Sequence, residues 1–336
     1  VISGKITLQS ELRPQLRLYT VLVGESADDR KSTAISQVNS FFHTTLIHND
    51  FNPVYGVGSA EGLAKCFKKN NRVILILDEL KSLIQKMRID ASVLLPCINT
   101  LFDSNRFHSY TKSHDIEIDD AQLCLLAAST LDTYRNMFNS TFMDIGFLNR
   151  LFIVIGNSER KFSIPEMIPP AIKESLRADL VDLLNFVGQL SQNGIYAMPL
   201  NSTARDIFSA WYFGLERSTF AKRLDSYGHR LMPLLAINEG LEVITPEIAE
   251  KTVTLLNYQF QARQFADPID ADNTIAKLEE RIRRLLAGGP LSKRELERRV
   301  NKSRVGIWAW EQAMKNLRNT GEISWDPHRG EFRLNP

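Results

Sequence analysis

The stretch VLVGESADDRKST, from Val21 to Thr33, decides the fold class of this 336-residue chain. An apolar strand runs into Gly24, a polar loop follows, and Lys-Ser-Thr opens a helix predicted over residues 31–42. A turn between a strand and a helix directs backbone N–H groups and the positive end of the helix dipole at one place. The sequence therefore predicts a phosphate-binding loop.

The loop departs from the usual pattern of Gly, four residues, Gly, Lys and Ser or Thr. One extra residue separates Gly24 from Lys31, and Arg30 stands where the pattern has its second glycine, so a side chain restricts the backbone there. We interpret Lys31 as the ligand of the β- and γ-phosphates, Ser32 as the Mg²⁺ ligand, and Arg30 as a further phosphate or neighbouring-subunit contact. The alternative is an ordinary helix start capped by Ser26 or Asp28. The predicted ATP-binding set is completed by Gly24, Ser26 and Thr33.

A second apolar run, RVILILDEL from Arg72 to Leu80, ends in two carboxylates. A continuous apolar run is typical of a central parallel strand buried on both faces, with its end at the ligand edge of the sheet. In ATPases with a phosphate loop, the first carboxylate holds Mg²⁺ and the second orients or deprotonates the attacking water. This assigns Asp78 to the metal and Glu79 to catalysis, against the alternative of an acidic helix cap. Together the two motifs predict ATP and Mg²⁺ as cofactors.

The remaining strands and helices extend this domain. Apolar strands are predicted at 123–130 and 151–156, a hairpin at 107–118, and a helix at 81–102 that Pro96 interrupts. Because strands that alternate with helices require parallel crossovers, we predict an α/β domain over 1–165 with a nucleotide at its carboxyl edge. Residues 166–270 are predicted to form a helical domain.

Composition agrees with an ordinary globular protein. Hydrophobic residues make up 43% and charged residues 24% of the chain, which is long enough for two domains. The absence of an 18-residue apolar run or a charged-then-apolar leader predicts no membrane contact and a cytoplasmic location. Cys66, Cys97 and Cys124 lack the spacing of a zinc site or a disulfide framework.

The C-terminal part is predicted to be a winged-helix domain over 271–336. A helix over 275–286 is followed by a helix that Ser292 caps, with Glu295 completing a capping box, and by a third helix over about 304–319. Two short strands at 322–325 and 331–334 make the wing. From 275 to 336 there are four Lys and ten Arg against eight Asp and Glu, so the net charge there is +6 and upstream it is −4.

This positive charge predicts a polyanion partner, and DNA is the favoured one. A winged helix usually lays its third helix in the major groove while the wing touches the backbone. Trp308 and Leu317 are interpreted as core residues, and Trp310 is left open. The alternative is that this domain packs on protein. The predicted DNA contacts are Arg304, Gln312, Lys315, Arg318 and Arg329.

In the order of its motifs, the chain resembles AAA+ ATPases of the helicase group. LAAST, at 126–130, is similar to the sensor 1 strand of minichromosome-maintenance helicases, and Ser129 takes the place of the usual Asn. GFLNRLF, at 146–152, is similar to their arginine-finger segment, so Arg150 is expected to reach a neighbouring subunit's ATP. YGHRL, at 227–231, resembles the lid segment and implies Arg230 as sensor 2, with Arg217 and Arg223 as alternatives.

The resemblance also implies partners. Helicases of this group line the central channel with a hairpin before the sensor strand, so Lys112 and His114 are expected to touch DNA, against the alternative of a surface hairpin. The RKST and ILDEL motifs look like those of a P-loop family in replication proteins of phages, plasmids and other mobile elements. Those proteins often carry an upstream primase domain, which would suit a chain that begins with Val1.

Three functions follow from this resemblance. The first is a homo-oligomeric DNA helicase or translocase for replication of a mobile element, with a hexameric ring as one candidate. The second is an ATP-dependent DNA-binding switch, loader or defence regulator without unwinding activity. The third is a non-catalytic initiator in which nucleotide stabilises an oligomer. The expected fold class is an α/β P-loop AAA+ core with a parallel sheet, a helical lid and a C-terminal winged helix.

Overall fold

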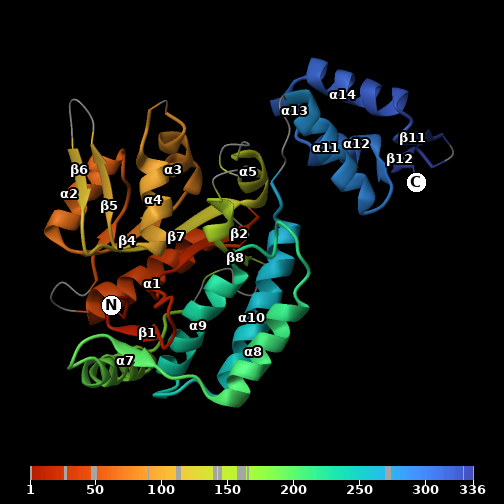
Figure 1. The fold of residues 1–336 in the computed structure, drawn as a ribbon. Helices are drawn as coiled ribbons and strands as arrows, with labels where there is room; N and C mark the ends of the chain where they lie inside the picture. The colour runs from red at the N-terminus through yellow and green to blue at the C-terminus, as the bar shows by residue number, and fades with distance from the viewer. Residues whose placement is uncertain are drawn as a thin grey trace. The chain divides into compact units, whose positions relative to one another are not determined.

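The computed structural model describes residues 2–25, 29–46, 51–89, 91–110, 115–138, 142, 146–156, 164, 166–268, 274–327 and 329–335 (Figure 1). The protein is mixed α/β with a parallel sheet, as the alternation of strands and helices predicts. It divides into two compact units. The first unit comprises Val1–Tyr134 and Ile145–Ala266, and the second comprises Arg135–Asp144 and Asp267–Pro336.

A five-stranded parallel sheet in the order β3-β4-β7-β2-β8 forms the centre of the first unit. Chain connections leave β2 and β7 in opposite directions across the sheet, toward β3 and β8. In such sheets ligands bind in the crevice outside the carboxyl ends of the two strands where the direction reverses. The predicted phosphate loop follows β2, so the topology places it at this crevice. The strands are β2 (Tyr19–Gly24), β3 (Pro53–Val54), β4 (Arg72–Leu77), β7 (Gln122–Thr130) and β8 (Phe152–Ile155).

Helices cover both faces of this sheet. On one face, Ile35 of α1 (Lys31–Thr45) packs in a cluster with Ile76 and Ala128 of the strands. On β2, Leu22 packs against that cluster, and because side chains alternate along a strand, Tyr19 faces the opposite side. There its hydroxyl donates a hydrogen bond of 2.8 Å to the carbonyl of Ile98 in α4 (Leu94–Asp103).

The predicted helix over 81–102 is present as two helices, α3 (Leu80–Met87) and α4. The break lies between them and not at Pro96, which sits in the first turn of α4. A proline is tolerated there because a first-turn N–H has no partner within the helix. Upstream, Ser59 caps α2 (Ala60–Lys69) by accepting a hydrogen bond of 3.2 Å from the N–H of Gly62.

The predicted hairpin is also present, since β5 (Phe107–Tyr110) and β6 (Asp115–Ile118) pair antiparallel. Its tip, with the proposed DNA contacts Lys112 and His114, lies outside the described residues. Two short helical turns follow β7, α5 (Leu131–Asn136) and the 3₁₀ turn η1 (Leu148–Arg150).

The helical part belongs to the same compact unit as the sheet. The side chain of Gln259 binds the backbone of the edge strand β8 through two hydrogen bonds. It accepts one of 2.7 Å from the N–H of Ile153 and donates one of 2.9 Å to the carbonyl of the same residue. This pairing satisfies an edge that would otherwise be exposed. One short strand, β9 (Tyr196–Met198), lies inside the segment predicted to be helical, and it pairs in parallel with β1 (Ile6–Leu8) near the start of the chain. The helices are α7 (Pro170–Leu190), α8 (Ser202–Gly214), α9 (Leu224–Asn238) and α10 (Pro246–Phe265).

The second unit has its own hydrophobic core, which includes Leu278, Ile282, Trp310 and Phe332. Its elements follow the order expected for a winged helix, although the third helix is divided at Gly306, whose φ is +96°. The sheet has three antiparallel strands in the order β10-β12-β11. The elements are α11 (Thr274–Ala287), β10 (Leu291–Ser292), α12 (Lys293–Arg299), α13 (Lys302–Val305), α14 (Ile307–Asn319), β11 (Ile323–Asp326) and β12 (Glu331–Leu334).

Half of the predicted capping box forms in α12. The Ser292 side chain accepts a hydrogen bond of 3.2 Å from the N–H of Glu295. The Glu295 carboxylate pairs instead with Arg299 at 2.7 Å, because a charged partner one turn ahead offers a stronger bond than a backbone N–H. Among the described residues, no helix has the length and apolar character needed to cross a bilayer.

Candidate functional site

The structure describes both ends of the loop between β2 and α1, which is the predicted phosphate-binding loop. The strand predicted over 18–23 is present as β2 and ends one residue later, at Gly24, and the helix begins at Lys31 as the sequence predicts. Arg30, which replaces the second glycine of the usual pattern, has φ 43° and ψ 36°. This is the left-handed conformation that glycine adopts easily, and it costs another residue roughly 1–2 kcal/mol. The chain therefore keeps the glycine conformation without the glycine.

Lys31 folds back over this loop. Its Nζ donates hydrogen bonds of 3.1 Å to the carbonyl of Gly24 and 2.6 Å to that of Glu25. The ammonium group is thus held at the carboxyl end of β2, where a compact positive charge can meet phosphate oxygens. Ser32 and Thr33 lie exposed in the first turn of α1, whereas Ser26 lies outside the described residues.

Asp29 is a loop residue whose importance sequence reasoning missed. Its Oδ2 accepts a hydrogen bond of 2.6 Å from the N–H of Glu25. A Cβ added to Gly24 would lie 2.1 Å from that oxygen, and one added to Gly156 would lie 2.9 Å from it. The carboxylate therefore needs glycine at both positions, and it occupies a backbone donor of the kind that phosphate uses. The signal in the sequence was the adjacent pair of carboxylates Asp28 and Asp29 inside the predicted phosphate loop, where negative charge is unexpected.

The acidic end of β4 connects to the end of β7. Glu79 is the N-cap of α3, where its carboxylate accepts a hydrogen bond of 3.4 Å from the N–H of Lys81. The Ser129 hydroxyl donates to the same carboxylate at 3.4 Å, and Ser129 is 1% exposed. The predicted catalytic pair Glu79 and Ser129 is therefore in contact. Since β7 separates β4 from β2, the two strands lie roughly 10 Å apart across the sheet. The pairing register places Leu77, the last residue of β4, level with Val21, three residues before the end of β2.

The proposed Mg²⁺ ligands fit the chemistry of that ion. Ser32 and Asp78 both offer exposed oxygen atoms at this edge of the sheet. In nucleotide sites Mg²⁺ takes one or two protein oxygens and completes its shell with phosphate and water. The described residues contain no group of three or more His, Cys, Asp or Glu that could hold a metal.

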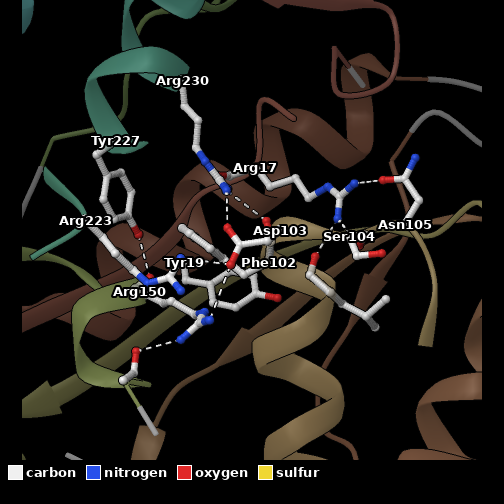
Figure 2. A network of polar contacts seen from close by, with 12 residues as sticks. Arg17, Tyr19, Phe102, Asp103, Ser104, Asn105, Arg150, Arg223, Tyr227 and Arg230 are labelled. Carbon is white, nitrogen blue, oxygen red and sulfur yellow. Dashed lines mark hydrogen bonds and ion pairs between the residues drawn. The ribbon is translucent and has the colours of Figure 1, made fainter. Parts of the chain in front are cut away.

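Arg150 lies in a buried network of polar contacts centred on Asp103 (Figure 2). It is 9% exposed, and its guanidinium donates to the carbonyl of Gly146 at 2.9 Å and to Asp103 at 3.3 Å. Burial, and then the nearby charge of Arg223, lower the pKa of Arg150, while Asp103 opposes that shift. In this conformation Arg150 is an internal ion-pair residue, which does not fit the expected reach to a neighbouring subunit's ATP.

Arg230 belongs to the same network and not to the phosphate loop. It is 2% exposed and donates to the carbonyls of Arg17 and Phe102, each at 2.9 Å, and to Asp103 at 3.1 Å. Its guanidinium also stacks 3.7 Å from the centre of the Phe102 ring. The alternative sensor 2 residue, Arg223, pairs with Asp103 at 2.8 Å. Neither arrangement fits a contact with a nucleotide at Lys31, because both guanidinium groups are engaged by α4.

A cavity of about 500 Å³ in the first unit does not coincide with this site. It is lined largely by apolar residues, and Arg72 and Gln122, the first residues of β4 and β7, are among its walls. It therefore lies toward the amino ends of the strands, while the phosphate loop lies at their carboxyl ends.

In the second unit, four of the five predicted DNA contacts are exposed. These are Arg304, Lys315, Arg318 and Arg329. Gln312 is half-buried, and its side-chain amide donates a hydrogen bond of 2.9 Å to the side-chain oxygen of Asn316. Trp308 is 71% exposed, so its assignment to the core is wrong, whereas Trp310 is 3% and Leu317 1% exposed. Rotation along α14 explains the difference, since Trp308 lies two residues from Trp310 and therefore faces away from it.

Comparison with known proteins does not decide between these functions. No family model matches the sequence, and a search of curated proteins finds no significant relative. The functional argument therefore rests on the geometry of the chain's own residues.

Proposed function

We propose that this chain binds Mg²⁺-ATP at the carboxyl edge of its parallel sheet and hydrolyses it, and that its binding to DNA depends on this ATP. The single observation that carries the nucleotide site is the position of Lys31. Its ammonium donates to the carbonyls of Gly24 and Glu25 at the end of β2, and Arg30, the residue before α1, is left-handed. A fixed cation beside a helix N-terminus is the arrangement that phosphate groups need.

Each site residue then has a defined role in the proposal. Lys31 binds the β- and γ-phosphates, and Ser32 and Asp78 hold Mg²⁺, which would neutralise charge on the phosphates. Glu79 orients the attacking water or takes its proton. Ser129, hydrogen-bonded to Glu79, fixes the direction of that carboxylate. Ser129 belongs to the strand between β4 and β2, which supports a role in relaying the presence of nucleotide to Glu79.

The DNA-binding role is supported by the second unit. Its residues from 275 to 336 carry a net charge of +6, and a winged helix is the fold that their order of elements supports best. Arg304, Lys315 and Arg318 are exposed on its third-helix segment, where phosphate contacts would give affinity without sequence preference.

The position of Arg150 favours an ATP-dependent switch over a ring-forming motor. A motor of the proposed kind needs an arginine from one subunit at the ATP of the next. In this structure Arg150 is instead held by Asp103 and Gly146. The helicase or translocase hypothesis, with a homo-oligomeric ring, requires that this network opens, and strand displacement by the wild-type protein would support it.

Calorimetric titration with Mg²⁺-ATP tests the nucleotide site. We expect Lys31→Ala to weaken binding at least tenfold, and Lys65→Ala, an exposed helical lysine away from the loop, to bind like the wild type. Glu79→Gln should retain binding and lose turnover, because the amide keeps an oxygen but cannot accept the proton of water. Equal heats for wild type and Lys31→Ala would remove the basis of the proposal.

A further inference from the structure

Two large apolar side chains stand exposed at the start of α14. Trp308 is 71% exposed and Ile307 is 65% exposed, although both belong to the helix that supplies much of the second unit's core. Exposing an indole to water forfeits the favourable burial of an aromatic ring of roughly 150–250 Å². We therefore expect a partner whose surface would bury these two side chains.

The same helix face carries positive charge. Trp308, Glu311, Lys315 and Arg318 are all exposed, and their spacing of three, four and three residues places them on one stripe of α14. We call these four residues the exposed stripe. At 1.5 Å per residue, Lys315 and Arg318 lie roughly 10 and 15 Å along the helix from Trp308.

Several other carboxylates of the unit form ion pairs with cations of the same unit. Glu322 pairs with Arg283 at 2.5 Å, Glu280 with Arg284 at 2.9 Å, and Glu297 with Lys302 at 2.8 Å. Within the part of the chain that the structure describes, by contrast, no ion pair involves Lys315 or Arg318. The stripe therefore presents uncompensated cations, opposed only by Glu311, and is complementary to a polyanion.

A protein partner fits this surface less well. A stable protein interface buries about 800 Å² on each side, whereas Trp308 and Ile307 offer only a small apolar tip among charges. In the major groove of DNA, an apolar tip meets a matching group, because the C5-methyl of thymine is the apolar group on the groove floor. Residues near the start of a recognition helix are the ones that reach base edges, and Trp308 is the second residue of α14.

We propose that Trp308, supported by Ile307, contacts thymine methyl groups in the major groove of duplex DNA, while Lys315 and Arg318 bind the phosphates. This inference rests on the proposed DNA binding and adds a base preference to it. The second unit should accordingly favour duplexes rich in A·T pairs that expose thymine methyls.

Replacing thymine by uracil in a labelled A·T-rich duplex tests this contact, because only the methyl groups are removed. With the full chain and fluorescence anisotropy, we expect the wild type to bind the uracil duplex about fourfold more weakly for each contacted methyl. Trp308→Ala should bind both duplexes equally, with the affinity of the wild type for the uracil duplex or less. Trp308→Phe should retain part of the discrimination.

Salt dependence separates the apolar contact from the ionic ones. Lys315→Ala should lower the slope of log affinity against log salt by about 1, whereas Trp308→Ala should leave that slope unchanged. Because Trp308 is exposed, its variant should fold normally, which circular dichroism checks.

The outcomes are distinguishable. Thymine discrimination that persists in Trp308→Ala would overturn the inference while leaving DNA binding intact, and so would wild-type affinity of that variant. A self-associating wild type whose Trp308→Ala variant is monomeric would assign the tip to a second copy of the chain and overturn the inference as well. If the wild type binds neither duplex, the proposed DNA function itself is wrong and the inference falls with it.

Discussion

Replacing Asp103 by alanine should destabilise the first unit strongly. This carboxylate forms ion pairs with three arginines. Its oxygens lie 3.1 Å from a guanidinium nitrogen of Arg230, 2.8 Å from one of Arg223 and 3.3 Å from one of Arg150. The side chains of Arg230 and Arg150 are 3% and 11% exposed, so removing their shared anion leaves two nearly buried cations without it. Breaking a buried ion pair costs about 3–5 kcal/mol. Asp103 itself is 42% exposed, and screening by water reduces the expected loss to roughly 2–4 kcal/mol.

Urea-induced unfolding followed by circular dichroism measures this loss. The matched control is Asp119→Ala, which removes an aspartate that pairs with Arg106 at 3.3 Å with both side chains more than half exposed. An exposed pair is worth at most about 1 kcal/mol. Asp103→Asn, which retains an acceptor oxygen without the charge, should fall between the two. The reasoning is refuted if Asp103→Ala costs no more than Asp119→Ala.

Three further predictions concern other parts of the first unit. Gly228→Ala should lower the free energy of unfolding by about 1–3 kcal/mol and so lower the urea midpoint, because the new Cβ would lie 2.5 Å from Cε2 of Phe208; an unchanged midpoint would contradict this. Burial lowers the pKa of His229, against the opposing charge of Asp225, so the unfolded state binds more protons and stability should fall as pH drops from about 6.5 toward the folded-state pKa. His229→Gln should flatten that part of a pH titration of unfolding free energy. Asp29→Asn should tighten Mg²⁺-ATP binding in calorimetry, since it removes a negative charge from the phosphate loop, and an unchanged dissociation constant would show that the carboxylate does not compete with phosphate.

Local chemistry in the sequence predicted much of the local structure correctly. The strand ending at Gly24 and the helix beginning at Lys31 follow from an apolar run, a polar loop and a helix start. Ser59 and Ser292 cap helices as their residue type indicates. Pro96 shows the limit of that reasoning, since a proline breaks a helix interior but suits a first turn, and only the preceding residues decide which applies.

The sequence placed Glu79 and Ser129 each at the end of a predicted strand, and the structure shows that their side chains are in contact. By contrast, the sequence did not predict that Arg150 and Arg230 both contact Asp103. An arginine is the same residue whether it meets a phosphate or a carboxylate of its own chain, and the partner Asp103 lies 47 residues from Arg150 and 127 from Arg230 along the chain. The sequence offered no signal that α4 would end beside both.

The sequence by itself determined the alternation of strands and helices, the start of a helix at Lys31 and the excess of positive charge from residue 275 onward, because these depend on near neighbours and on composition. Tertiary structure alone decided the order of the strands, the burial of the arginines around Asp103 and the exposure of Trp308. Each of these depends on which distant segments pack together, and packing is fixed by the fit of whole surfaces, which a short motif does not encode.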